Sequence, residues 1–185
     1  MGWRSGIFRA ITIPVVVCLG AVTGVYAQTV SQSVSAQIVP MGNLASVPAS
    51  VTLAQPTVPF TSYATTLTIG YQARTTPTGG GEITMLVTAD FSAAGSGGPS
   101  AANGDLTYTC GTADLGTSCG SSPITASPTT QTQVVQIPSS ACTGGGSPCS
   151  SVNTNKVTVN LSLADSPALK SGSYTASLTF TISAT

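Results

Sequence analysis

The side chains that could carry out acid–base or nucleophilic chemistry are few in this sequence. The chain contains no histidine and only five acidic residues. A hydrolase usually needs a nucleophile together with a base of tuned proton affinity. Without histidine, two carboxylates would have to act as the acid–base pair. The available ones are Glu82, Asp90, Asp105, Asp114 and Asp165.

The positions of these carboxylates favour structural roles. Asp105 follows an Asn-Gly pair and Asp165 precedes a Ser-Pro pair, while Glu82 and Asp90 fall at or near the ends of an expected strand. Such residues commonly shape turns. Asp114 with scattered hydroxyls makes a poor calcium site, because calcium takes six to eight oxygen ligands. We therefore expect no enzyme activity, no metal site and no cofactor.

The first 27 residues have the composition of an export signal. Arg4 and Arg9 give a positive start, an apolar run extends over residues 11–25, and small or branched residues precede the expected cleavage after Ala27. The run is short and interrupted by glycine and threonine, which disfavours a membrane-spanning helix. An uncleaved anchor is the alternative. Residues 28–185 would then be one secreted domain, in the periplasm or on a bacterial cell surface.

The cysteines indicate two small covalent loops. Cys18 would leave with the signal, and the four that remain are Cys110, Cys119, Cys142 and Cys149. An even number in an exported chain favours disulfides. Three pairings are open, and the short spans favour closing each loop locally. Zinc is the weaker alternative, because neither pair has the Cys-x-x-Cys spacing of structural zinc sites and the chain has no histidine.

The mature chain has too little charge to bind a polyanion. Its basic residues would be Arg74, Lys156 and Lys170, against the five carboxylates. So weak a field excludes nucleic acid and acidic membrane surfaces as partners. Serine and threonine must then provide solubility, and threonine, being β-branched, favours strands.

The clearest structural signal lies at the carboxyl end. Apolar residues occupy every second position there: Tyr174, Ala176, Leu178, Phe180, Ile182 and Ala184. This alternation puts one apolar face on a strand, with serine and threonine on the other. We expect this strand to be central in its sheet, with its apolar face turned into the core.

Alternating residues between turn signals predict the other strands. They cover residues 29–39, 50–54, 63–73, 83–91, 106–110, 131–137 and 157–163. The strands at 63–73 and 83–91 are expected to form a hairpin, and residues 92–104 a mobile loop. Seven or eight strands favour an all-β, antiparallel, immunoglobulin-like Greek-key sandwich, with a closed barrel as the alternative.

Two local patterns resemble those of known folds. Leu169-x-x-Gly172-x-Tyr174 resembles the tyrosine corner of Greek-key sandwiches, where a tyrosine hydroxyl ties a crossing loop to its strand; a turn glycine before an ordinary core tyrosine is the alternative. The spacing of Gly172, Leu178, Phe180 and Ile182 from the carboxyl end resembles the C-terminal motif of bacterial chaperone–usher pilus subunits and spore-coat-U-like proteins.

This second resemblance implies an immunoglobulin-like domain that lacks one strand. A periplasmic chaperone fills the groove first, and at assembly the N-terminal extension of another copy replaces it by strand addition. An usher and further copies of the chain would be the other partners. The acceptor groove would be lined by Leu178, Phe180 and Ile182. The donor strand, within residues 28–40, would supply Val30, Val34, Ala36 and Ile38.

Two features depart from the pilus pattern. Ala184 stands where these subunits have a penultimate tyrosine, and the cysteines fall in the second half of the domain. Two functions therefore remain open for a secreted, non-catalytic surface protein. One is a pilus-like subunit that assembles by strand exchange. The other is a self-complete sandwich that acts in adhesion or ligand binding, with residues 29–39 paired to their own domain.

Overall fold

The computed structural model describes residues 32–91, 97–143, 149, 151–152 and 154–185, and residues 37–185 form one compact unit. The predicted signal peptide, its cleavage site after Ala27 and the donor candidate Val30 lie outside the described residues. In the described part of the chain, the helical element is the short 3-10 turn η1 (Ala101–Asn103). No helix of that part is long and apolar enough to cross a membrane.

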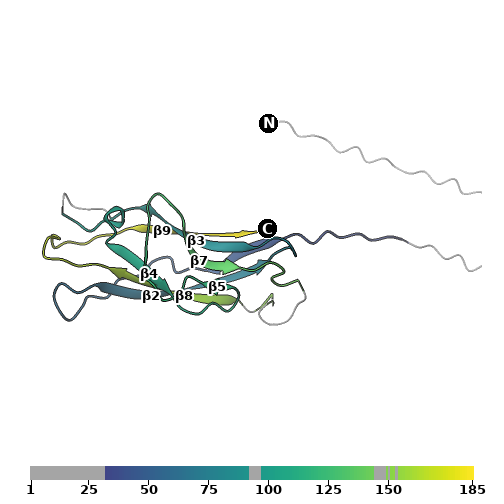
Figure 1. Cartoon of the computed structure of the whole chain (residues 1–185), viewed down its shortest axis with the longest axis horizontal. Coiled ribbons are helices and arrows are strands. Elements are labelled where there is room, and N and C mark those ends of the chain that lie inside the picture. The colour runs from purple at the N-terminus through teal and green to yellow at the C-terminus, as the bar shows by residue number, and fades with distance from the viewer. Residues whose placement is uncertain (1–31, 92–96, 144–148, 150, 153) are drawn as a thin grey trace, which may run out of the picture. The chain divides into compact units, whose positions relative to one another are not determined.

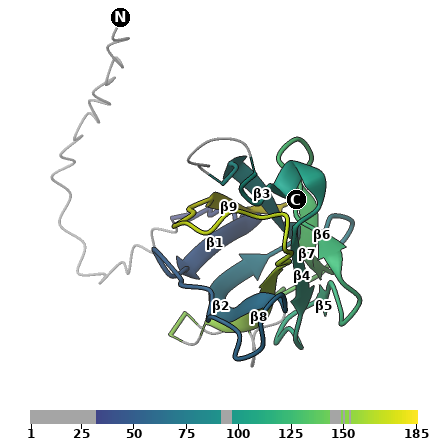
Figure 2. The ribbon, with the colours of Figure 1, turned by 90° about the vertical axis from the view of Figure 1, so that its left-hand side faces the viewer.

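Two antiparallel sheets make up the domain and confirm the predicted all-β sandwich (Figures 1 and 2). The first sheet has the order β1-β2-β8-β4-β6. Its strands are Met41–Ser46, Tyr63–Arg74, Asn155–Leu163, Leu106–Cys110 and Ile124–Thr125. The second sheet has the order β5-β7-β3-β9. Its strands are Thr117–Ser118, Thr132–Ile137, Gly81–Ala89 and Ser177–Ala184.

One face of each long strand enters a common core. The buried residues include Leu67 and Ile69 of β2, Ile83 and Met85 of β3, and Val157 and Val159 of β8. Two tyrosines lie among them with their hydroxyls satisfied. Tyr71 Oη donates to the Leu115 carbonyl, and Tyr108 Oη donates to the Gln133 carbonyl at 2.8 Å. Burial raises the pKa of both phenols, so they act as neutral hydrogen-bond donors within the core.

The strand order follows the immunoglobulin pattern with one place unfilled. In that pattern one sheet has the order A-B-E-D and the other the order C-F-G. The row β1-β2-β8-β4 matches the first order, and β3 with β9 take the places of C and F. The G place lies on the outer side of β9, and no strand of the described residues occupies it.

The position of the C-terminal strand corrects the prediction. β9 is the edge of its sheet and is not central, because it pairs with β3 alone among the described strands. Its side chains alternate between exposed and half-buried. The alternation of apolar residues was therefore a correct guide to the strand and to its inward face, but it carried no information about the number of neighbours.

Three other expectations were wrong in their pairing or bounds. β2 and β3 do not form a hairpin, because they lie in different sheets and pair with other strands. Residues 32–40 are in no strand, and the first strand, β1, begins only after Pro40. The predicted strand at 50–54 is reduced to a single bridge between Ala54 and Ala64. Pro48, Pro56 and Pro59 surround this stretch and remove ladder hydrogen bonds from it.

Two disulfides close the loops that the cysteine spacing favoured, Cys110–Cys119 and Cys142–Cys149. The first joins the sheets. Cys110 ends β4 of one sheet, and Cys119 follows β5 of the other and donates its backbone N–H to Val134 in β7. The second lies within the connection between β7 and β8. The Cys110–Cys119 bridge therefore constrains the packing of the two sheets, and the Cys142–Cys149 bridge constrains only the loop between β7 and β8.

Asp90 holds the connection between β3 and β4. Its carboxylate accepts hydrogen bonds from Ser100 Oγ and from the backbone N–H groups of Phe91, Ala101 and Ala102. Partial burial alone would raise the pKa of Asp90, but these hydrogen bonds outweigh it and lower the pKa below its ordinary value. Within the loop expected at residues 92–104, residues 100–102 are thus tied to the end of β3.

We expect Asp90→Asn to lower the free energy of unfolding at neutral pH by about 1 kcal/mol, because the neutral amide has one acceptor oxygen in place of two and loses charge-assisted hydrogen bonds. Because folding lowers the pKa of Asp90, its contribution is present above the unfolded-state pKa of about 3.9 and is lost as the pH falls through the folded-state pKa. The difference between variant and parent should therefore shrink below about pH 4. Urea unfolding across pH measures it.

Asp165→Asn is the matched control for this experiment, because the Asp165 side chain has no hydrogen-bond or ion-pair partner in the part of the chain that the structure describes. It should leave the stability nearly unchanged at every pH. Equal effects of the two substitutions would contradict the anchoring role of Asp90.

The disulfides give a second prediction. Replacing Cys110 and Cys119 together by serine should lower the free energy of unfolding by about 2–3 kcal/mol, as expected for a loop of this size, and by more than the same change at Cys142 and Cys149. The physical reason for the difference is that only the first bridge ties one sheet to the other. Chemical denaturation of both double variants checks this order, and a larger loss at Cys142 and Cys149 would contradict it.

Candidate functional site

The candidate site is the outer edge of β9. One side of this strand pairs with β3 from Ser177 to Ala184. Its end is held firmly, because Thr185 donates its N–H to Gly80 and accepts one from Thr76, at 2.8 and 2.9 Å. The other side faces no strand among the described residues. A row of backbone donors and acceptors is therefore available there for an added strand.

The three predicted groove residues share the inward face of this edge. Leu178, Phe180 and Ile182 lie directly opposite Val87, Met85 and Ile83 of β3. The β3 residues are buried, whereas their β9 partners are only half-buried. The difference arises because β3 has a neighbour on both sides and β9 has one. An apolar stripe is thus left partly open along the edge.

The opposite wall of this stripe is β1, the edge strand of the other sheet. β1 and β9 lie beside each other across the sandwich (Figure 2). At the carboxyl end of β9 they nearly touch, because a Cβ added to Gly42 would come 3.0 Å from Ile182 Cγ1. We call the space between β1 and β9 the seam. The seam is narrow at Ile182, because a side chain at position 42 would require the Ile182 side chain to shift.

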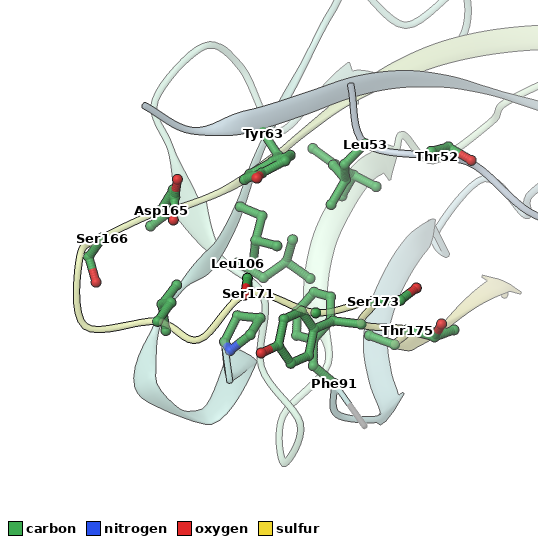
Figure 3. A pocket seen from close by; sticks show the side chains of 18 of the residues that line it. Thr52, Leu53, Tyr63, Phe91, Leu106, Asp165, Ser166, Ser171, Ser173 and Thr175 are labelled. Carbon is green, nitrogen blue, oxygen red and sulfur yellow. The ribbon is translucent and has the colours of Figure 1, made fainter. Parts of the chain in front are cut away.

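At the other end of β9 the seam opens into a cavity of about 620 Å³. Its apolar lining includes Leu53, Tyr63, Phe91, Leu106 and Leu178. Figure 3 shows Leu53 and Tyr63 on one side of the hollow and Phe91 on the other. The rim is polar and carries Asp165, Ser166, Ser171 and Ser173. The cavity can accept a branched apolar side chain, and it provides no convergent pair of acid and base.

A tyrosine corner shapes the rim of the cavity. Tyr174 Oη donates to the Lys170 carbonyl at 2.7 Å, as the Leu-x-x-Gly-x-Tyr pattern predicted. Gly172 is required beneath the ring, because a Cβ there would lie 3.2 Å from two ring-end atoms of Tyr174. The corner fixes the loop that leads into β9 and keeps it clear of the open edge.

The predicted donor residues are unburied in the single chain. Val34 is 91% exposed and Ile38 is 76% exposed, and Ala36 between them is exposed as well. Residues 32–39 form no strand. Three apolar side chains at alternate positions of an uncharged segment are therefore exposed to water. Their exposure costs free energy unless a partner covers them.

Three of the five carboxylates, Asp90, Asp105 and Asp114, hold backbone segments of the fold. Asp105 accepts a hydrogen bond from the Ser100 N–H, and Asp114 accepts one from the Lys156 N–H, both at 2.8 Å. Asp90 and Asp105 both anchor the segment at residues 100–102, and Asp114 anchors a different loop. Within the described residues no group of three or more histidine, cysteine or acidic side chains is placed to hold a metal ion.

Sequence reasoning missed the residues that form the walls of the seam. Leu53 was expected in a strand and Phe91 at a strand end, and neither was recognised as lining a cavity. Gly42 was not singled out at all, because a glycine in an undistinguished stretch gives no signal until its neighbour across the sandwich is known.

The open edge leads to a stability prediction. Phe180→Ala should lower the free energy of unfolding of dilute protein by roughly half, or less, of the 2–5 kcal/mol typical of a buried apolar truncation. Its cross-strand neighbour is the natural control, since Met85→Ala removes a fully buried side chain at the same register position. Urea unfolding of both variants measures the difference. Equal losses would mean that Phe180 is as well covered as Met85.

Comparison with known proteins assigns no family to this chain. No protein-family model matches it, and no curated protein matches it significantly. Three features of the structure bear on function: an unpaired edge strand, a half-open apolar seam and an exposed apolar segment.

Proposed function

We propose that this chain is a non-catalytic, exported structural subunit that assembles on a cell surface by strand exchange. In this proposal residues 28–40 of one copy add as a strand to the outer edge of β9 in another. The observation that carries it is the unfilled place beside β9, where an immunoglobulin-type sandwich has its last strand. Leu178, Phe180 and Ile182 remain half-buried for want of that strand.

The exposed segment is a suitable occupant for this place. Val34, Ala36 and Ile38 alternate with polar residues, so an extended segment would present all three on one face. Both partners are uncharged, since neither residues 28–40 nor β9 contains an acidic or basic residue. Binding would cover apolar area on both sides and pair the free backbone groups of β9. These are the two sources of affinity in strand addition.

A second copy supplies the segment more readily than the same chain does. Residue 40 leads directly into β1, which runs antiparallel to β2 and passes Ile182 at Gly42. To fill its own seam, the segment would have to reverse direction between Val39 and Met41 and lie parallel to β9. Two-residue reversals between strands need a positive φ at one or both central residues, which the β-branched Val39 and Pro40 disfavour. A segment from another copy needs no reversal.

Before assembly the edge needs a temporary cover, because unpaired apolar edges promote aggregation. A periplasmic chaperone that lends a strand, and an usher that exchanges it, would provide this. Ala184 at the penultimate position, where the pilus families have tyrosine, indicates that such a chaperone would recognise this chain through other residues.

The competing function is a self-complete surface module that acts in adhesion. Its support is the contact between Gly42 and Ile182, which already closes one end of the seam without an added strand. In that case the chain would be monomeric, and the cavity beside Leu178 would be the natural place for a ligand.

Peptide binding to a donor-deficient chain separates the two functions. The mature chain with Val34→Asp and Ile38→Asp should be monomeric, because both changes lie on the face that would enter the seam. A synthetic peptide of residues 28–40, at about 100 times its Kd, should then stabilise this variant by about 2.7 kcal/mol. This corresponds to an increase in Tm of roughly 5–10 °C for a domain of this size.

The matched control places the same charges on the opposite face. Ser35→Asp with Gln37→Asp should leave self-association intact, because these side chains would point outward to solvent. Light scattering of the two double variants and the parent reports the mass. A monomeric parent whose Tm is unchanged by the peptide would overturn the proposed function and leave the self-complete module.

A further inference from the structure

Three segments that are distant in the sequence meet at the carboxyl end of β9. They are the connection between β2 and β3, the connection between β7 and β8, and Thr185. A continuous set of hydrogen bonds joins them. None of the described residues that make these hydrogen bonds lines the cavity at the other end of β9. The carboxyl end of β9 is therefore held separately from the cavity end.

Thr75 holds the connection between β7 and β8 from both sides, and it is only 2% exposed. Its hydroxyl donates to the Pro138 carbonyl and accepts from the Ala141 N–H, both at 2.8 Å. Its own N–H donates to the Ala141 carbonyl at 3.1 Å. Ala141 is buried as well. Residues 138–141 are thus folded around one buried hydroxyl group.

The next residue along the chain links this segment to β9. Thr76 accepts the Ser140 N–H at its carbonyl, at 2.8 Å, and donates its own N–H to the Thr185 carbonyl at 2.9 Å. Thr185 in turn donates its N–H to the Gly80 carbonyl at 2.8 Å, and its hydroxyl accepts the Gly80 N–H at 3.2 Å. β9 is therefore fixed at this end by a turn that is itself bonded to residues 138–141.

This segment holds an unfavourable backbone conformation. Ser140 and Cys142 have φ values of 58° and 57°, and they are two of the three residues other than glycine with positive φ in the described part of the chain. Residues with a Cβ rarely occupy this region and remain there only where their surroundings impose it. Here the constraints are the hydrogen bonds to Thr75 and the Cys142–Cys149 bridge. We call residues 138–142 together with this bridge the latch.

The bridge of the latch is the more accessible of the two disulfides. Cys142 and Cys149 are both half-buried, whereas Cys110 is 6% exposed and belongs to the core between the sheets. In thiol–disulfide exchange a thiolate must approach a sulfur atom of the bridge, so the rate depends on access. A dithiol should therefore reduce Cys142–Cys149 before Cys110–Cys119.

We propose that the Cys142–Cys149 bridge is a redox latch for the carboxyl end of β9. The closed bridge keeps residues 140–142 in their strained conformation, so that Thr75 and Thr76 stay in the position that binds Thr185. When the bridge opens, the strained residues relax, the hydrogen bonds to Thr75 are lost, and Thr185 separates from its partners. This device does not depend on strand exchange. It makes the mobility of β9 depend on the redox state of the surroundings.

The reductant in this proposal is a dithiol. One of its thiolates attacks a sulfur atom of the bridge and forms a mixed disulfide, and the displaced sulfur leaves as a thiolate that takes up a proton. The second thiolate of the dithiol then attacks the mixed disulfide and releases the other cysteine. Two electrons and two protons pass to the protein, which gains two thiols, while the dithiol becomes a disulfide.

Limited reduction of the full mature chain with dithiothreitol tests the latch. Alkylation and mass spectrometry identify the conditions in which the latch bridge is open and Cys110–Cys119 is intact. Amide hydrogen exchange, followed by NMR, should then be at least about tenfold faster at Thr76, Ala141 and Thr185 than in the oxidised chain, because local opening exposes these N–H groups.

Two N–H groups outside the latch are the internal controls. Those of Val87 and Gly111 donate to the Ser127 and Thr158 carbonyls elsewhere in the domain. They should exchange at the same rates before and after limited reduction. The variant with Cys142→Ser and Cys149→Ser should show the same pattern without a reductant.

Thr75→Val tests the hydrogen-bonded link while the bridge stays closed. Valine has the shape of threonine but lacks the hydroxyl, so the Thr185 N–H should again exchange about tenfold faster, now in the oxidised chain. Thr107→Val is the matched control, because the Thr107 hydroxyl donates to the Ser162 carbonyl in the other sheet. It should leave the exchange at Thr185 unchanged.

Four results would overturn the proposal. Reduction of Cys110–Cys119 before the latch bridge, or together with it, would show that the latch is not selectively reducible. Unchanged exchange at Thr185 in the reduced chain would show that β9 is held without the bridge. An equal increase at Val87 would show that the bridge contributes only to global stability. Unchanged exchange at Thr185 in Thr75→Val would break the link itself. None of these results bears on the proposed strand exchange.

Discussion

The pairing of β9 on one side only is the constraint on which the proposed function of this domain depends. The strand exchanges backbone hydrogen bonds with β3 along its whole length, and its terminus is pinned to residues 76 and 80. Its other edge has no neighbour in the described chain, and its apolar side chains are covered on one flank only. A partner strand at this edge would both pair the backbone groups and cover the apolar side chains. A small polar ligand could not do both.

The rest of the domain is built to remain folded while this edge is open. The core between the sheets is closed by fully buried residues of β2, β3 and β8. The Cys110–Cys119 bridge joins the two sheets covalently. Asp90 secures the connection from β3 to β4, and Tyr174 secures the loop that leads into β9. In the described residues no buried side-chain polar atom lacks a hydrogen-bond partner.

The few acidic side chains of this chain have mainly structural roles. Ionisable side chains are scarce, and three of the five carboxylates are engaged by backbone N–H groups that they hold in loops. Each is thereby committed to one local geometry, with Asp90 and Asp105 both bound to Ser100 and Asp114 bound to Lys156. A surface of serine and threonine hydroxyls with few charges also offers little to an electrostatically steered partner. Recognition through backbone pairing and alternate apolar side chains fits such a chain better, since it needs no charge.

The sequence by itself determined the features that depend on residues near each other in the chain. Period-two alternation located β2, β3, β4, β8 and β9, because a strand with one buried face must repeat every second residue. Close cysteine spacing indicated the two local disulfide loops, and the Leu169 to Tyr174 pattern indicated the corner. Only the tertiary structure decided which strands pair. It separated β2 from β3, began the first strand at Met41, and placed β9 at an edge. Alternation indicates which face of a strand is apolar, but it does not indicate which strands lie on either side of it. The seam, with Gly42 against Ile182 and the cavity at Leu178, depends on residues that are distant in sequence and meet only when two sheets pack.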